Sequence, residues 1–257
     1  MGALLEVTGL QKRFGGLVVL DGVSFAAARG EILGIIGPNG AGKTTLFNIL
    51  SGIYEPDAGA ITLDGGPLAG LEVHAVAARG VGRTFQNVKL FANMSVLENV
   101  MVGRHCRTRA GLLQALLRPG SARKEERSIR EQAVRELEFV GLQDHAALPS
   151  SSLPFGKQRL LEIARTLASH PKLILLDEPA AGLNPRETRE LGGIIARILE
   201  RGITLLLVEH DMELVMEVSH RILVLHNGRK ICEGTPREVQ SHPEVITAYL
   251  GEAPAGA

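Results

Sequence analysis

The sequence predicts an α/β fold with a largely parallel sheet and a helical subdomain set into it. Short apolar runs of strand length, such as residues 32–36 and 173–176, alternate with segments of helical pattern, which is the order expected of βαβ units. From about residue 91 to 168 the strand signals fade and apolar residues recur at three- and four-residue spacing, as on a one-faced helix. These two observations predict an α/β core interrupted by helices.

Composition narrows the class of protein. The chain has 257 residues, 45% of them hydrophobic and 22% charged, which is typical of a globular protein and not of a disordered one. Its 28 Lys plus Arg balance 28 Asp plus Glu, whereas a simple nucleic-acid-binding domain usually carries a basic excess. We therefore expect no nucleic-acid partner.

Cysteine usage and hydropathy indicate the compartment. Cys106 and Cys232 form no C-x-x-C pair and are too few for a disulfide framework, so we interpret both as reduced thiols. No apolar run approaches the ~18 residues needed to cross a bilayer, and the first residues lack the pattern of a signal peptide. The expectation is a protein that neither spans a membrane nor is exported.

The first predicted βα unit begins at residues 32–36, a buried strand that ends in the turn cluster 37–40. A helical run over residues 45–50 follows. In the middle of the chain, one helix closed by Gly141 is predicted from four apolar residues that share one face: Ile129, Ala133, Leu137 and Val140.

In the second half of the chain, residues that mark the start and the end of a helix are easier to identify. Between predicted strands at 173–176 and 203–208 lies a helix with Asn184 as N-cap, Pro185 at its first position, Glu187 completing a capping box and Gly202 just past its end.

The C-terminal part contains a predicted hairpin and a capped helix. Residues 221–225 and 229–233 are joined by Asn227-Gly228, a pair that tolerates the positive φ angles of a tight turn. Thr235 then opens a last short helix as a capping box. Residues 251–257 are expected to form a frayed tail.

The strongest chemical signal is the stretch after the first strand, which matches G-x-x-x-x-G-K-[ST]. Glycines let backbone N–H groups turn toward phosphate oxygens, and the N-terminus of the following helix favours the same negative charge. The lysine adds a charge for the β- and γ-phosphates, and the threonine hydroxyl can hold Mg²⁺. The alternative is a Gly-rich turn that precedes a helix by chance, but strand, loop and helix occur in the required order. The motif residues are Gly37, Pro38, Asn39, Gly40, Ala41, Gly42, Lys43 and Thr44.

A triphosphate site also needs an acidic element, and Asp177-Glu178 supplies it at the end of the apolar strand at 173–176. Asp177 can fix Mg²⁺ through water, and Glu178 can orient or deprotonate the attacking water. Alone, an acidic pair after a strand is often merely solvated. Together with the phosphate loop it is the expected partner.

With these motifs the chain resembles the ATP-binding subunit of an ABC transporter over nearly its full length. Gln86 in Thr-Phe-Gln-Asn resembles the Q-loop glutamine of that family, and His210 resembles its switch histidine. A further stretch, P-x-x-G-x-I-x-x-x-G, fits residues 56–65. Individually, an exposed amide or a histidine at a strand end is usually structural; four motifs in the family's order make chance similarity very improbable.

The resemblance implies a fold, a domain organisation and roles for residues. It implies a P-loop ATPase core with an antiparallel β subdomain over residues 1–90 and 165–257, and a helical subdomain over residues 91–164. It implies ATP and Mg²⁺ as ligands, with Thr45 beside the phosphates and Thr44, Gln86 and Asp177 near the metal. In such proteins the glutamine also senses the membrane partner, and the histidine contacts the γ-phosphate.

Phe14 stands where the family places an aromatic ring that stacks on adenine. An aromatic after a short strand is more often part of a core, so this assignment depends on the resemblance.

The signature motif departs from the family's L-S-G-G-Q. Pro154 replaces the serine whose hydroxyl would contact the γ-phosphate of the opposite subunit, and Lys157 adds a charge. The helix N-terminus remains, with the helix itself expected over residues 160–168. Asn184 likewise replaces the usual Asp of the D-loop. The motif residues here are Leu153, Pro154, Phe155, Gly156 and Lys157.

Local segments, including residues 161–165, 180–185 and 233–251, resemble the larger ATPase of the branched-chain amino acid importer. That resemblance implies a second ATP-binding subunit, two membrane permeases and, indirectly, a solute-binding protein, with this chain on the cytoplasmic face of the inner membrane. Importers of urea and short amides and the lipopolysaccharide export ATPase share much of the pattern. A non-transport ATPase of DNA repair or translation would need a coiled-coil insertion or a second cassette, for which 257 residues leave no room. A nucleotide-dependent regulator without turnover is the binding-module alternative.

Charge is uneven along the chain, because residues 104–135 contain nine Lys or Arg and three acids. A solvated helix face is the ordinary interpretation of such a run. The sharper hypothesis places it toward the anionic inner leaflet of a membrane.

Overall fold

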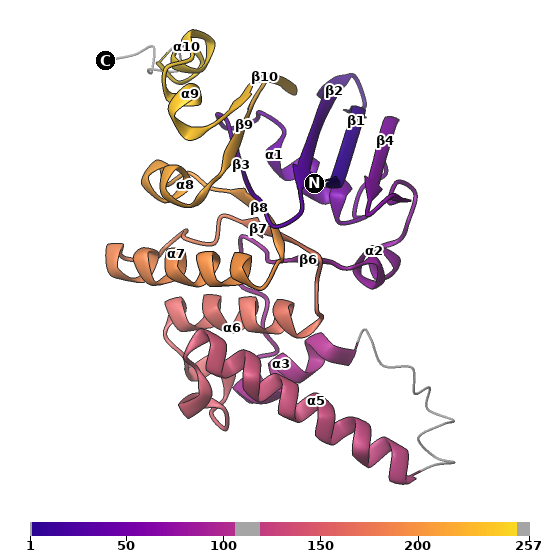
Figure 1. The fold of residues 1–257 in the computed structure, drawn as a ribbon, viewed down its shortest axis with the longest axis vertical. Coiled ribbons are helices and arrows are strands. Elements are labelled where there is room, and N and C mark those ends of the chain that lie inside the picture. The colour runs from indigo at the N-terminus through magenta and orange to yellow at the C-terminus, as the bar shows by residue number, and fades with distance from the viewer. Residues whose placement is uncertain (1, 106–118, 251–257) are drawn as a thin grey trace.

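The computed structural model describes residues 2–105 and 119–250. Within them the chain forms two sheets, which Figure 1 shows together with the helices around them. The smaller sheet is antiparallel, in the order β2-β1-β4-β5. Its strands are β1 (Ala3–Phe14), β2 (Leu17–Ala28), β4 (Ala58–Leu63) and β5 (Gly66–Pro67).

The larger sheet has six strands in the order β10-β9-β3-β8-β7-β6. It is parallel from β6 to β9, and β10 joins it through an antiparallel hairpin with β9. Every residue of β3, β7 and β8 is buried, as expected of strands covered on both faces. The strands are β3 (Ile32–Ile36), β6 (Val81–Arg83), β7 (Leu173–Asp177), β8 (Thr204–Val208), β9 (Arg221–His226) and β10 (Arg229–Gly234).

Alternate residues of these strands serve two different cores. Leu33 and Leu206 face a cluster shared with the small sheet and with α1, where Phe47 is fully buried. Ile32 and Leu205 face a second cluster shared with helices α3, α5, α6 and α7. The helices are α1 (Lys43–Leu50), α2 (Val73–Arg79), α3 (Val96–His105), α5 (Pro119–Val140), α6 (Phe155–Ala168), α7 (Pro185–Glu200), α8 (Met212–Val218), α9 (Pro236–Gln240) and α10 (Pro243–Leu250).

Figure 1 shows α3, α5 and α6 packed together at the end of the molecule opposite the small sheet. The predicted one-faced helix is confirmed as α5, because its four apolar residues are all buried, and three of them, Ala133, Leu137 and Val140, belong to the second core. Gly141 follows it with a φ of 75°. The mixed α/β fold expected from the sequence is therefore confirmed.

The capping and turn residues identified in the sequence correctly marked where helices begin and where the hairpin turns. Asn184 caps α7 in a capping box with Glu187, and Thr235 caps α9 in the same way. The tight turn of the β9–β10 hairpin has positive φ at both Asn227 and Gly228.

Two predicted helix starts and the predicted last helix were wrong. Helix α1 begins at Lys43 rather than at residue 45, and α6 begins at Phe155 rather than at residue 160. In both cases a loop motif continues directly into the first helical turn, so its glycines do not mark the helix start. Helix α9 is not the last helix either, since α10 follows it after a short turn.

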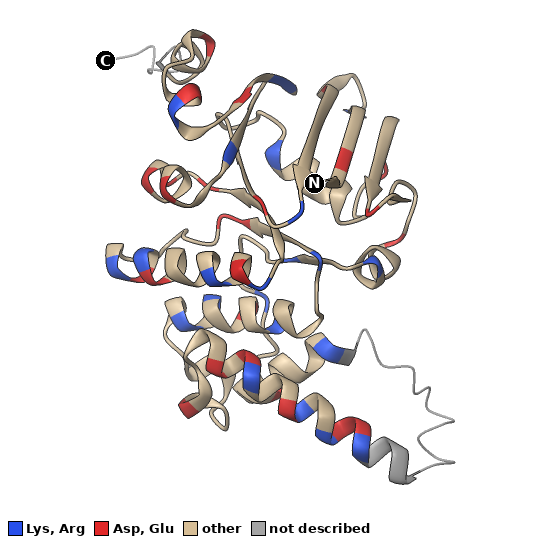
Figure 2. Ribbon diagram, in the orientation of Figure 1, with Lys and Arg blue, Asp and Glu red and all other residues tan. Residues whose placement is uncertain are grey.

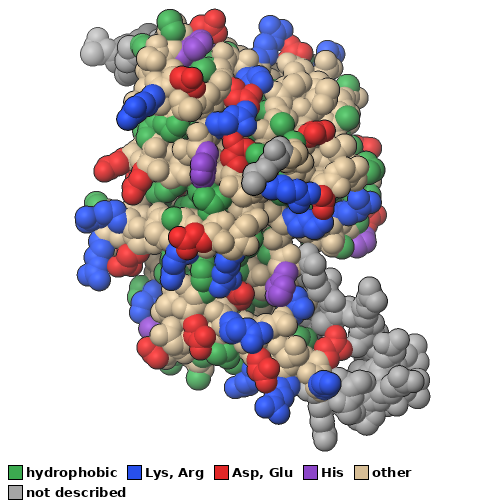
Figure 3. Space-filling view, in the orientation of Figure 1, with side chains coloured by type: hydrophobic (Ala, Val, Ile, Leu, Met, Phe, Trp, Pro, Cys, Tyr) green, Lys and Arg blue, Asp and Glu red, His purple; other side chains and the backbone are tan. Residues whose placement is uncertain are grey.

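Charged residues of both signs are mixed along the ribbon in Figure 2, and charged side chains of both signs are mixed over the face of the molecule seen in Figure 3. Part of the basic run at 104–135, with Arg107, Arg109 and Arg118, lies outside the described residues, as do Cys106 and residues 251–257. No helix in the described part of the chain is long and apolar enough to cross a membrane.

Candidate functional site

The phosphate-binding motif forms the loop between β3 and α1. Gly42 has a φ of 102°, and a Cβ at this position would lie 2.9 Å from the Val19 carbonyl oxygen. At Gly37 a Cβ would lie 2.1 Å from the Leu225 carbonyl oxygen. Side chains are therefore excluded by the backbone of neighbouring strands, and the loop stays open to a ligand.

Lys43 is buried at the start of α1, and its ammonium group lies over the loop. Its Nζ donates hydrogen bonds to the carbonyl oxygens of Gly37 and, at 3.0 Å, of Pro38. The loop surrounds a cavity of about 180 Å³. The residues that line it are Val19, Asn39, Gly40, Ala41, Gly42, Lys43, Thr44, Thr45, Glu178 and His210.

Three predicted residues meet at Glu178. The Gln86 side-chain amide donates to one carboxylate oxygen at 2.9 Å, and His210 Nε2 lies 3.2 Å from the other. The backbone of Glu178 has a φ of 49°, in the left-handed region that residues other than glycine rarely adopt. The Glu178 N–H donates to the Val208 carbonyl oxygen. All three residues follow neighbouring parallel strands, β6, β7 and β8, whose carboxyl ends meet at one edge of the sheet.

Glu209 is a buried carboxylate beside this group that sequence reasoning missed. It accepts hydrogen bonds from the backbone N–H groups of Ala180, His210 and Asp211. Burial raises the pKa of the Glu209 carboxyl, and these backbone hydrogen bonds oppose the rise. Glu209 therefore joins the segment after β7 to the segment after β8. The sequence signal that could have identified Glu209 is a carboxylate directly after an apolar strand.

Asp177, the predicted metal-binding carboxylate, is not among the residues that line the cavity. It forms a buried ion pair with Arg83, at 2.8 Å, which sequence reasoning also missed. Its backbone N–H donates to the Thr84 hydroxyl at 3.4 Å. A charged residue at the end of the apolar strand 81–83 was the only sequence signal for this pair.

The signature residues lie away from the cavity, and none of the five lines it. Pro154 stands at the N-cap position of α6 and supplies no side-chain cap. Phe155 is exposed, and Gly156 lies so close to Glu187 that a Cβ would meet a carboxylate oxygen at 2.6 Å. The Lys157 ammonium lies 2.8 Å from His145 Nε2.

Phe14 ends β1 and is 43% exposed, which argues against a role in the core. Its ring makes an edge-to-face contact with Tyr54, with 5.3 Å between the centroids. Lys12 Nζ lies 5.4 Å from the centroid of the same ring. An exposed aromatic face beside a second ring is a surface on which a flat base can stack.

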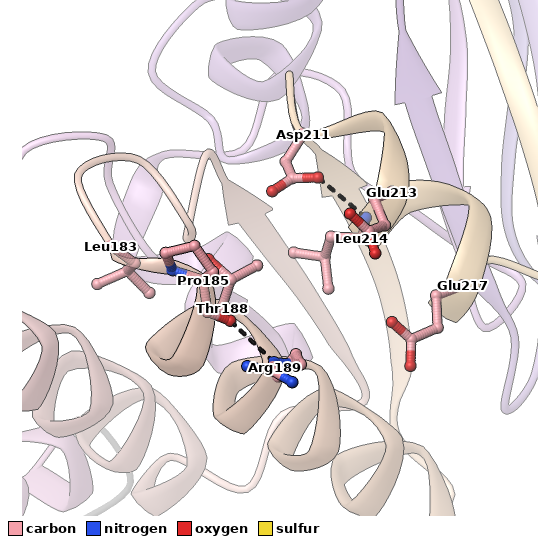
Figure 4. A pocket seen from close by; sticks show the side chains of 8 residues that line it. All are labelled: Leu183, Pro185, Thr188, Arg189, Asp211, Glu213, Leu214 and Glu217. Carbon is pink, nitrogen blue, oxygen red and sulfur yellow. Dashed lines mark hydrogen bonds between the residues drawn. The ribbon is translucent and has the colours of Figure 1, made fainter.

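A larger pocket, of about 330 Å³, lies between α7 and α8 (Figure 4). Three acidic residues, Asp211, Glu213 and Glu217, line it, and Asp211 is occupied in capping α8 through the Leu214 N–H. Arg189 also lines this pocket, so its charged lining consists of three carboxylates and one guanidinium. This acidic excess disfavours a triphosphate.

Comparisons with known proteins agree with this geometry. The family model described as ABC transporter matches residues 20–181, and the model for branched-chain amino acid ATP-binding cassette transporters matches residues 229–255. The chain is 48% identical to the high-affinity branched-chain amino acid transport ATP-binding protein LivG of Salmonella typhimurium and 46% identical to the corresponding BraF of Pseudomonas aeruginosa. Each alignment covers 97% of this chain and 98% of the relative. A crystal structure of the ADP conformation of an ATP-binding cassette of an ABC transporter superposes with a TM-score of 0.85 at 32% identity, covering 98% of this chain and all of that one.

Proposed function

Because the chain belongs to the ATP-binding subunits of ABC transporters, we propose that it powers the import of branched-chain amino acids through a membrane permease complex. It binds nucleotide and hydrolyses ATP. The C-terminal match to the branched-chain amino acid family model favours this solute over urea, short amides or lipopolysaccharide. The proposed partners are a second ATP-binding subunit, two permeases on whose cytoplasmic side the chain docks, and a solute-binding protein that it does not touch.

One observation supports the hydrolytic assignment above all others. Glu178 lies at the cavity of the phosphate loop with each carboxylate oxygen held by a different partner, Gln86 and His210. A carboxylate in this place can accept a proton from water that attacks the terminal phosphate. Gln86 and His210 fix its orientation at the cavity, which Glu178 lines.

The other residues bind and orient ATP. Lys43 and backbone N–H groups of the loop between β3 and α1 hold the phosphates, and Phe14 stacks on adenine. The residues at the metal position fit Mg²⁺, because Thr44, Gln86 and Asp177 offer hydroxyl, amide and carboxylate oxygens, the hard ligands that this ion prefers. In the described part of the chain no three His, Cys, Asp or Glu cluster as a metal cage. Bound there, Mg²⁺ would neutralise charge that develops on the phosphates.

The signature segment completes the site of a second copy. Leu153, Pro154, Phe155, Gly156 and Lys157 carry the N-terminus of α6, which suits an anion, but they face no phosphate loop in their own chain. In this proposal residues 91–164 act as a helical subdomain that moves with the permease, while residues 1–90 and 165–257 form the core.

Co-expression with candidate permeases tests the transport assignment. We expect the chain to co-purify with two permease subunits and a second ATPase, and vesicles holding this complex to accumulate leucine only with ATP and solute-binding protein. Uptake of urea but not of leucine would overturn the solute assignment. ATP hydrolysis without any permease association would overturn the transport assignment.

A further inference from the structure

Arg83 is a buried arginine that the proposed mechanism does not use. It is the last residue of β6, and its side chain is only 7% exposed. One guanidinium nitrogen donates to Asn48 Oδ1 and to Ser51 Oγ, both at 2.8 Å. The other donates to Asp177 Oδ2, also at 2.8 Å.

These contacts join two motifs that are far apart in the sequence. Asn48 lies on α1, the helix that begins with Lys43 and Thr44, and Ser51 is its C-cap. Asp177 ends β7. A single planar guanidinium thus connects the helix of the phosphate loop to the acidic strand end, through a fork of donors that only arginine provides.

The surroundings hold the fork in place. The Arg83 guanidinium lies 5.8 Å from the centroid of the Phe47 ring and 5.0 Å from that of Phe85. Asp177 is 6% exposed at its side chain, so little water competes for its oxygens. The Asp177 carboxylate therefore has its position relative to α1 set by Arg83 and not by solvent.

We propose that Arg83 is a positioning residue for Mg²⁺: it sets the place of the Asp177 carboxylate relative to Thr44. The proposal rests on the proposed function, in which Asp177 and Thr44 hold the ion. Partners that orient metal ligands typically change metal affinity 10- to 100-fold when they are removed.

A purely structural role makes a different prediction. If Arg83 only compensated the buried charge of Asp177, lysine would replace it, since lysine keeps the charge. Lysine cannot reproduce the fork toward Asn48 and Ser51. Asn48→Ala gives an independent test, because it removes one of the two acceptors of the same guanidinium nitrogen and leaves the hydrogen bond to Ser51 and the ion pair with Asp177 intact.

The experiment measures binding of a fluorescent ATP analogue to the full chain, first in EDTA and then over a magnesium chloride titration. For Arg83→Lys we expect affinity in EDTA within about twofold of wild type and about a tenfold rise in the Mg²⁺ concentration at half effect. Asn48→Ala should shift that concentration in the same direction, by about threefold. The matched control is Arg221→Lys, which alters a partly buried arginine paired with Glu31 and Glu233, remote from the cavity, and should shift neither value.

Each other outcome decides against the proposal. An unchanged Mg²⁺ dependence in both variants would show that the fork does not position Asp177. A folded Arg83→Lys variant that loses affinity equally in EDTA and in Mg²⁺ would make Arg83 a general support of the loop. If Arg83→Lys does not fold, an unshifted Asn48→Ala variant suffices to overturn the proposal. A wild-type chain that binds no nucleotide in either condition would overturn the proposed function itself.

Discussion

Two regions of the molecule carry nucleotide-site motifs: the carboxyl ends of the parallel strands and the N-terminus of α6. Only the motif residues at the strand ends come together within the chain. After β6, β7 and β8, Gln86, Glu178 and His210 meet within hydrogen-bond distance. At α6, Phe155 is exposed and Lys157 pairs with His145, and neither lines the phosphate cavity.

The difference reflects how each region is built. Neighbouring parallel strands bring their carboxyl ends to one edge of the sheet whatever their distance in the sequence. Helix α6 is instead placed by packing against α3 and α5, in the core that these helices share with one face of the large sheet and with α7. The residues at the strand ends form one group within the chain, whereas the residues at α6 are proposed to complete the site of a second copy.

Glu178→Gln changes the central residue of the group at the strand ends and should have the largest effect on ATP turnover. Glutamine keeps the size of the side chain but cannot accept the proton of water, so turnover should fall about 10²- to 10⁴-fold while ATP binding remains. Steady-state ATPase activity of the partnered complex and equilibrium binding of ATP measure the two quantities. The exposed Glu213→Gln is the control and should change neither. Full ATPase activity in Glu178→Gln would refute the base assignment.

Pro154→Ser tests the second region of the comparison, the N-terminus of α6. A serine at this N-cap can accept a backbone N–H in the first turn of α6, a contribution of about 1 kcal/mol, and it restores the hydroxyl of the family's signature. In a Glu178→Gln background we expect ATP-induced self-association to strengthen about fivefold, which corresponds to about 1 kcal/mol. ATP binding by the monomer should not change.

Sedimentation with and without ATP measures this association. Pro154→Ala removes the ring without adding a hydroxyl and is the matched control. Equal association of the serine and alanine variants would show that the hydroxyl has no role across the interface.

The smallest expected effect is a pH dependence of the unfolding free energy, caused by Glu209 at the carboxyl end of β8. Because burial raises the pKa of Glu209 above its ordinary 4.5, folding favours the protonated carboxyl. Its stabilising contribution is complete below that value and is lost as pH rises through the folded pKa. The unfolding free energy of wild type relative to Glu209→Gln should therefore decrease from about pH 4 to neutral pH.

Urea denaturation of both proteins at several pH values measures the difference. Glu213→Gln should show no comparable trend, since Glu213 lies exposed on α8. A difference between wild type and Glu209→Gln that stays constant with pH would contradict the effect of burial.

Much of the fold could be predicted because its signals are local. The capping boxes at Asn184 and Thr235 and the Asn227-Gly228 turn depend on side chains that bond to their own backbone neighbourhood. The phosphate loop is local in the same sense. Where a motif continues directly into a helix, as at Lys43 and Phe155, the local signal hides the boundary.

The sequence by itself determined the α/β class, the phosphate loop and the catalytic candidates, because periodicity, glycine positions and residue chemistry are properties of short segments. Only the tertiary structure decided that Gln86 and His210 hold Glu178, that Arg83 joins Asp177 to α1, and that Glu209 is buried at three backbone N–H groups. These contacts join residues up to 94 positions apart. Their geometry depends on strand order and packing, which no local pattern encodes.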